Sequence, residues 1–80
     1  MAFVKQIQKD EGREIRSIHP TQLVCKYIVA HQNGHRILQL NSYGSDARDV
    51  PGKLSQTLQF DESSAAQLYA VLKAEFGFGD

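Results

Sequence analysis

The chain has 80 residues, of which 41% are hydrophobic and 22% charged, and its formal net charge is zero. These values are typical of a globular domain and exclude the low hydrophobicity of a disordered chain. No apolar run approaches the length of a membrane span, and the first residues lack the apolar centre of a signal peptide. We therefore expect one cytoplasmic domain, residues 1–80, whose small core favours a homodimer.

The N-terminal strand region, residues 1–21, carries the weakest pattern. Residues 3–8 alternate as in a short strand, and an amphipathic helix over the first ten residues is the alternative. A turn over residues 9–12 would lead to a returning strand over residues 13–18. His19-Pro20 ends that run, because proline fixes φ and removes a backbone donor.

Residues 22–60 carry the strongest pattern and predict three antiparallel strands. Asn33-Gly34 separates two β-branched, apolar runs, and this dipeptide readily adopts the positive φ of both central positions of a type I′ turn. Taking these two residues as the loop pairs residues 24–32 with residues 35–43, so that Val24 lies opposite Tyr43. This register predicts an apolar face formed by Leu23, Cys25, Tyr27, Val29, Leu38, Leu40, Leu58 and Phe60.

The opposite side of these strands, the polar face, is the candidate functional surface. One interpretation is an ordinary solvated face, as antiparallel sheets often have. The other is a nucleic-acid platform, in which Tyr43 stacks on a base while polar groups meet phosphates or base edges. The residues that the register places on the polar face are Val24, Lys26, Ile28, Gln39, Asn41, Tyr43, Ser55, Thr57 and Gln59.

The loop over residues 44–54 adds two cations at the rim of the polar face. Its length exceeds that of common hairpin loops, and loops of this length are more often functional. We therefore assign Arg48 and Lys53 to contacts with a phosphate backbone. The alternative is that Arg48 pairs with a neighbouring aspartate in solvent. The candidate nucleic-acid-binding residues are therefore Lys26, Gln39, Asn41, Tyr43, Arg48, Lys53, Ser55 and Thr57.

A helix is predicted over residues 61–76. Asp61 is a favourable N-cap, apolar residues follow at helical spacing, and Gly77 ends the run. Its apolar stripe needs a partner, and the apolar face of the sheet is the large one available. The predicted fold is α+β, a curved antiparallel sheet of about four to five strands followed by one C-terminal helix packed on one face.

Charge is divided unevenly along the chain. Residues 1–60 carry eight cationic and five anionic side chains, whereas residues 61–80 carry one cationic and four anionic side chains. This division places the net positive charge of the molecule on the sheet and its loops, as anion binding there requires.

No constellation of reactive side chains predicts an enzyme, a metal site or a cofactor. His31 and His35 flank the turn, and the register sends them to opposite faces of the sheet. Cys25, the single cysteine, lies on the apolar face and is expected to be a small buried residue. The chain has no nucleophile elbow, paired-carboxylate arrangement or glycine-rich phosphate loop. We expect a nonenzymatic protein that uses no metal, no cofactor and no small-molecule substrate.

A family resemblance is carried by the segment PGKLSQTLQFDESSAAQLYAVLKAEF. It resembles the single-stranded DNA-binding domain of the transcriptional coactivator positive cofactor four, including small bacterial relatives. The resemblance covers residues 22–76 and implies a domain that dimerises through its helices and binds single strands on its sheet. It implicates Lys53, Ser55 and Thr57, with Lys26 and Tyr43 on the preceding hairpin. This chain departs from that family in having no Trp and no net charge.

The segments IRSIHPTQLVCKY and NSYGSDARDVPGKLSQTLQF are also similar to a group of small bacterial proteins, some of which carry a formyltransferase label. A chain of this length cannot hold the folate-binding and transferase domains that such an activity needs. The sequence therefore predicts a protein that binds single-stranded DNA or RNA on its open sheet face, as an accessory factor in transcription or DNA processing. The alternative is a protein-interaction module or accessory subunit that uses the same face or a sheet edge.

Overall fold

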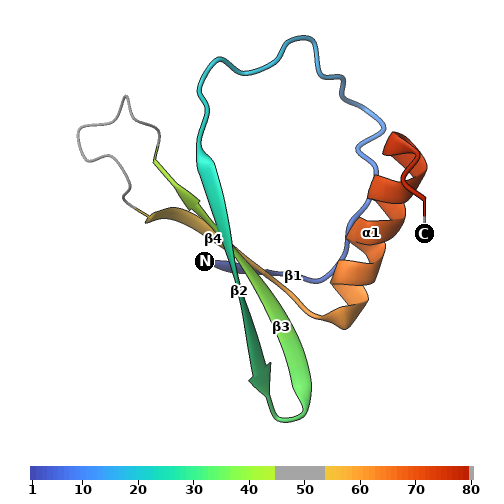
Figure 1. Cartoon of the computed structure of the whole chain (residues 1–80). Coiled ribbons are helices and arrows are strands. Elements are labelled where there is room, and N and C mark those ends of the chain that lie inside the picture. Colours follow the sequence, from blue (N-terminus) through green and yellow to red (C-terminus); the bar gives the residue numbers. More distant parts are fainter. Residues whose placement is uncertain (45–53, 80) are drawn as a thin grey trace.

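The computed structural model describes residues 1–44 and 54–79, which form a four-stranded mixed sheet followed by one helix (Figure 1). The elements are β1 (Ala2–Val4), β2 (Val24–Gln32), β3 (His35–Tyr43), β4 (Leu54–Phe60) and α1 (Glu62–Phe76). The strand order is β1-β4-β3-β2, with β1 parallel to β4 and the other pairs antiparallel. The predicted α+β class is confirmed, with β1 as the one parallel addition. No helix of the described ranges is long and apolar enough to cross a membrane.

The hairpin of β2 and β3 has the predicted turn and register. Asn33 and Gly34 have φ angles of 52° and 79°, both positive as a type I′ turn requires. Every residue of β2 has the predicted partner in β3, ending with Val24 opposite Tyr43. The turn residues and the alternation of side chains therefore fix which residues share a face.

The strand β4 extends both faces of the hairpin. Leu58 lies opposite Leu40 on the apolar face, and Thr57 lies opposite Asn41 on the polar face. The register shifts once, at Ser42 and Tyr43 of β3. The predicted division of side chains between two faces therefore holds across the three long strands from the hairpin end of the sheet as far as this shift.

The segment between β1 and β2, residues 5–23, which we call the arm, differs from the prediction. A first strand forms, but it covers Ala2–Val4 and not the predicted residues 3–8, and residues 13–18 are irregular, so the predicted returning strand is wrong. The arm passes α1, where the backbone N–H of Ile7 donates to Gln67 Oε1 at 2.9 Å, and then crosses to β2 in a wide arc (Figure 1). Ile15 and Ile18 are each 93% exposed, so no burial of apolar side chains holds this segment in a strand.

Both ends of α1 are fixed by the residues that the sequence predicted. The Asp61 carboxylate accepts from the Ser64 backbone N–H at 2.9 Å, and the Ser64 hydroxyl accepts from the Asp61 N–H at 3.1 Å, which completes a capping box. Gly77 has a φ of 71°, and its N–H donates to the Lys73 carbonyl at 2.9 Å.

Replacing Asp61 by alanine is expected to destabilise the protein in a pH-dependent manner. The hydrogen bond from the Ser64 backbone N–H lowers the pKa of Asp61 below its ordinary value. Because the folded-state pKa is the lower one, ionised Asp61 stabilises the fold above the unfolded-state pKa, and this contribution disappears as the pH falls through the folded-state pKa. Thermal unfolding of parent and variant should therefore differ near neutral pH and converge in acid.

The control for this experiment is Asp10→Ala. Asp10 is an exposed carboxylate whose only described ion pair joins its Oδ2 to Arg13 Nε at 3.6 Å, and such pairs contribute little to stability. A difference between Asp61→Ala and parent that stays constant down to strong acid would contradict the capping role of the carboxylate.

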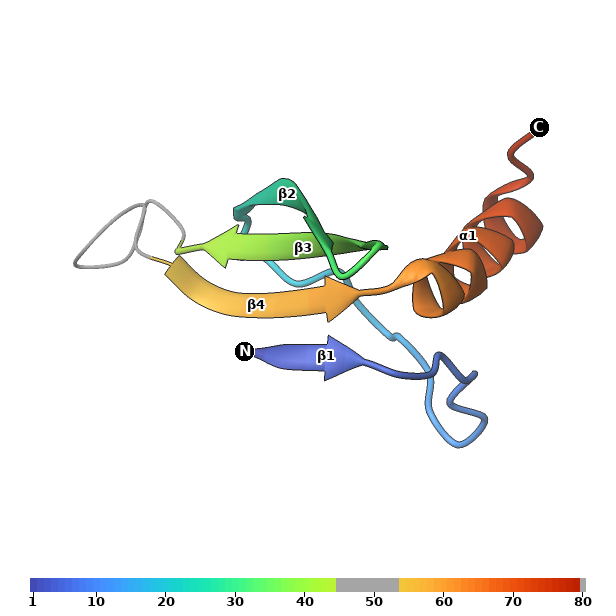
Figure 2. The same ribbon diagram turned by 90° about the horizontal axis from the view of Figure 1, so that it is seen from below.

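The helix contacts the sheet but does not cover the apolar face, contrary to expectation. Asp61 is the one residue between Phe60 and the start of α1, so the helix continues away from the end of β4 instead of folding back (Figure 2). Contacts of α1 with β3 and β4 are few, and Phe60 is the one buried hydrophobic residue of the described ranges. Cys25, predicted to be buried, is exposed, as are all the other residues of β2.

Candidate nucleic-acid interface

The polar face is built from alternate residues of β2, β3 and β4. The pairing sets Lys26 opposite Asn41 and Asn41 opposite Thr57, so these three side chains form one row across the sheet. Gln39 lies opposite Gln59 in a neighbouring row. The strand register therefore brings together polar side chains from three segments of the chain.

A continuous hydrogen-bond network joins the centre of this face. Gln59 Nε2 donates to Gln39 Oε1 at 2.9 Å, and Gln39 Nε2 donates to Asn41 Oδ1 at 3.0 Å. The Thr57 hydroxyl donates to the same Asn41 oxygen at 2.9 Å. Asn41 is 5% exposed and Thr57 is 6% exposed, so both lie beneath the surface that a ligand would touch. Their geometry suits them to orient Gln39 and Gln59, which are only partly buried.

Lys26 and Tyr43 form a cation–π pair beside this network. Lys26 Nζ lies 5.0 Å from the centre of the Tyr43 ring. This distance falls within the range in which an ammonium group is attracted to the face of an aromatic ring. The pair holds a cation and an aromatic ring together, and a base that stacks on Tyr43 must use its other face or displace Lys26.

The remaining predicted site residues lie toward the loop. Ser55 is exposed near the start of β4, at the register shift opposite Ser42 and Tyr43, so the pairing does not place it on the polar face. Arg48 and Lys53 lie outside the described residues, so their assignment to the rim stays a prediction.

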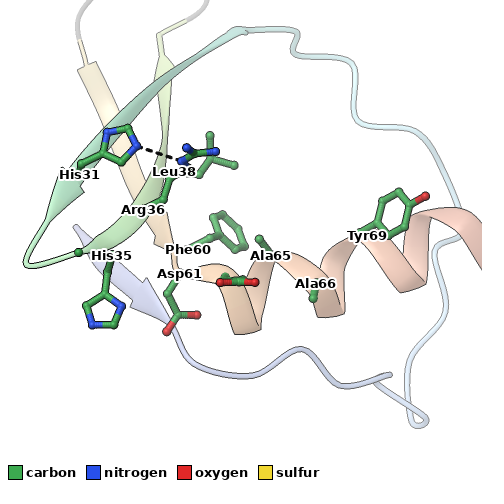
Figure 3. A pocket seen from close by; sticks show the side chains of 11 residues that line it. His31, His35, Arg36, Leu38, Phe60, Asp61, Ala65, Ala66 and Tyr69 are labelled. Carbon is green, nitrogen blue, oxygen red and sulfur yellow. Dashed lines mark hydrogen bonds between the residues drawn. The ribbon is translucent and has the colours of Figure 1, made fainter. Parts of the chain in front are cut away.

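A groove that sequence reasoning missed lies on the apolar side. This groove, of about 680 Å³, separates the tip of the hairpin from the first turns of α1 (Figure 3). Leu38, Phe60 and Ala65 contribute apolar walls, and Arg36 Nε donates to His31 Nε2 at 3.1 Å on the hairpin side. The register alone predicts that His31 faces Arg36, but the groove also depends on the direction in which the helix leaves the sheet.

The described residues contain no cluster of three or more His, Cys, Asp or Glu side chains that could hold a metal ion. Comparisons with family models, with curated proteins and with solved structures gave no match to this chain. The case for a function therefore depends on the geometry of the two faces.

Proposed function

We propose that this chain is a nonenzymatic protein that binds single-stranded DNA or RNA on its polar face. The observation that supports this proposal is the Lys26–Tyr43 pair beside an ordered row of side-chain amides. We also propose that it acts in the cytoplasm as a homodimer and as an accessory factor in transcription or DNA processing. The resemblance to the positive cofactor four domain is consistent with this assignment.

The chemistry of the face suits a ligand with alternating phosphates and bases. An ammonium group such as that of Lys26 releases counterions when it meets a phosphate, which makes binding sensitive to salt. An aromatic ring such as that of Tyr43 stacks on any base, because every base has a π face. The amides of Gln39 and Gln59 can donate to or accept from base edges. Together these groups favour single strands, whose bases are free to stack.

Tyr43→Ala and Lys26→Ala are expected to weaken the binding of a labelled oligo-thymidine strand. Loss of one stacked base costs about 1–3 kcal/mol, so Tyr43→Ala should raise the Kd by about tenfold. Lys26→Ala should lower the slope of log K against log salt by about one phosphate contact. Fluorescence anisotropy titrations at low and moderate salt measure both effects.

Two variants control for indirect effects. Tyr43→Phe keeps the ring and should bind like the parent, and Lys9→Ala removes an exposed lysine that lies in the arm, outside the polar face. No binding by the parent at low salt would rule out the nucleic-acid proposal. If Lys9→Ala and Lys26→Ala weakened oligonucleotide binding equally, the binding would be nonspecific electrostatic attraction and not recognition by the polar face.

One further observation favours a second candidate, a protein-interaction module. The nine-residue strand β2 lies at the edge of the sheet, and all of its residues are exposed. An edge strand of this kind can accept an additional strand from a partner through main-chain hydrogen bonds. A module of this kind should not bind the oligo-thymidine strand even at low salt, so the same titrations separate the two candidates.

A further inference from the structure

The strand β2 has one neighbour in the described sheet, β3, and its other side is a free edge. It borders the sheet on the side opposite β1 (Figure 2), and all nine of its residues are exposed. The main-chain groups at such an edge are a template for a further strand.

The hairpin turn determines which main-chain groups of β2 point to this edge. In a hairpin with a two-residue loop, the flanking residues, here Gln32 and His35, form a hydrogen-bonded pair. Hydrogen-bonded and non-hydrogen-bonded pairs then alternate, so every second residue from Gln32 directs its N–H and C=O to β3. The residues between them direct these groups to the free edge. We call them the edge residues: Cys25, Tyr27, Val29 and His31.

The strand β2 lacks most of the features by which proteins prevent pairing at an edge. Its sequence, VCKYIVAHQ, contains no proline, its pairing with β3 has no bulge, and Lys26 is its one charged residue apart from a histidine. Natural edge strands are commonly short, bulged, interrupted by proline or rich in charge. A long, regular and mainly apolar edge is therefore expected to have a partner.

The side chains beside the edge indicate what kind of strand fits there. Tyr27 and Val29, on the apolar face, are 71% and 46% exposed, and Ile28, on the polar face, is 53% exposed. Aromatic and β-branched residues stabilise one another across neighbouring strands, and like charges directly opposite are destabilising. The added strand should therefore supply apolar residues on both faces and no cation opposite Lys26.

The β2 strand of a second copy pairs with this edge in one antiparallel register. With a two-fold axis at Ile28, residues 24–32 of the two copies align over their whole length. Each edge residue then lies opposite an edge residue of the partner, and such pairs exchange two main-chain hydrogen bonds. Every other axis that matches edge residues with one another places Cys25 or His31 opposite a residue outside β2.

The same register also matches the side chains. Tyr27 lies opposite the partner's Val29, an aromatic residue against a β-branched one, and Ile28 lies opposite the partner's Ile28. Lys26 lies opposite the partner's Ala30, so the two ammonium groups do not face each other. A second copy thus meets each requirement of the edge.

The protomer exposes enough surface for this contact. Its solvent-accessible area is 7256 Å², whereas a compact monomer of this mass exposes about 4,900 Å². A specific interface of standard size buries about 800 Å² per partner, which is a fraction of this excess.

We propose that two copies join edge to edge through β2, in antiparallel register about Ile28, so that their two sheets form one continuous sheet. Paired residues share a face, so the polar faces of both copies lie on the same side of this sheet. The contact uses β2 and not α1, and it is therefore separate from the helix pairing that the resemblance implies. The inference rests on the proposed homodimer and identifies the strand through which it forms.

Opposite charges at Ile28 test the position of the two-fold axis. Ile28→Lys and Ile28→Glu each place like charges opposite each other, and each should raise the dimer Kd by about tenfold in sedimentation equilibrium. An equimolar mixture of the two variants should recover most of the parent affinity, because a mixed dimer has opposite charges on the axis. Val24→Lys is the control, because Val24 is also exposed and on the polar face but lies opposite the partner's Gln32. Circular dichroism verifies that each variant is folded.

Disulfide trapping provides a second measurement. Residues opposite each other in a non-hydrogen-bonded antiparallel pair have Cα atoms about 4.5 Å apart, which a disulfide can bridge. Cys25→Ser/Ile28→Cys should therefore form a covalent dimer of the 9.0 kDa chain on mild oxidation. Cys25→Ser/Ile15→Cys places the thiol at a position in the arm that is 93% exposed, and it should crosslink about tenfold more slowly.

The outcomes separate the edge pairing from the homodimer itself. A dimer whose Kd is unchanged by both charged variants, or in which Ile28→Cys crosslinks no faster than Ile15→Cys, would overturn the edge pairing and leave the homodimer intact. A parent that sediments as a monomer at every concentration would overturn both. Oligonucleotide binding is measured separately and is affected by neither result.

Discussion

Phe60→Ala is expected to remove most of the free energy of unfolding of the chain at room temperature. Phe60 is 5% exposed and lies between Val4 of β1 and Leu38 of β3, so its ring connects the edge strand, the centre of the sheet and the groove. Truncating a buried phenylalanine costs about 3–5 kcal/mol. Globular domains are stable by about 5–15 kcal/mol, and a chain of this size lies at the low end of that range. Urea denaturation followed by circular dichroism measures the loss.

Phe3→Ala is the matched control for this substitution. Phe3 lies opposite Gln59, one register position from Phe60, but it points to the other face and is 51% exposed. Its truncation should cost about 1 kcal/mol. A parent-like urea midpoint for Phe60→Ala would mean that apolar burial within the protomer contributes little to stability.

Asn41→Ala is expected to destabilise the polar face by about 1–3 kcal/mol, the cost of leaving a buried polar group without its partner. The Asn41 Oδ1 atom accepts from both Gln39 and Thr57. Without it, the Thr57 hydroxyl, in a residue that is 6% exposed, loses its acceptor. The decrease in the free energy of unfolding is measured in urea. Oligonucleotide affinity should also fall, because Gln39 is no longer held in place.

Thr57→Val tests whether the two buried residues act as a unit. Valine has nearly the shape of threonine but donates no hydrogen bond. Combining Thr57→Val with Asn41→Ala therefore removes the Thr57 hydroxyl that Asn41→Ala alone leaves without an acceptor. The double variant should therefore lose less stability than the two single variants predict by addition. Strict additivity would contradict the network.

The local parts of the fold were predictable from the sequence. Asn33-Gly34 determines the hairpin register, because only that loop gives both runs a consistent apolar side. Asp61 and Gly77 determine the ends of α1, because each supplies a group or a backbone conformation that a helix terminus needs. The membership of the polar face followed from the same register.

The parts that depend on distant contacts were not predictable. Whether α1 folds back over the sheet depends on the direction that the backbone takes at Asp61, and the spacing of apolar residues does not predict that direction. Because α1 continues away from the sheet, it leaves Cys25 exposed. The burial of Asn41 and the approach of Lys26 to the Tyr43 ring depend on side-chain conformations across three strands. The alternation of residues along a strand predicts which face of the sheet a side chain lies on, but not how deeply that side chain is buried.

The parallel pairing of β1 with β4 has a consequence for the order of folding. Ala2 pairs with Leu58, 56 positions farther along the chain, whereas the hairpin of β2 and β3 closes a loop of two residues. Closing a long loop costs more chain entropy before native contacts form to offset it, so contacts between distant residues form late in folding. During synthesis β1 emerges first but finds its neighbour last. Until then one edge of β4 has no partner strand, and nascent chains are most prone to pair with each other at that edge.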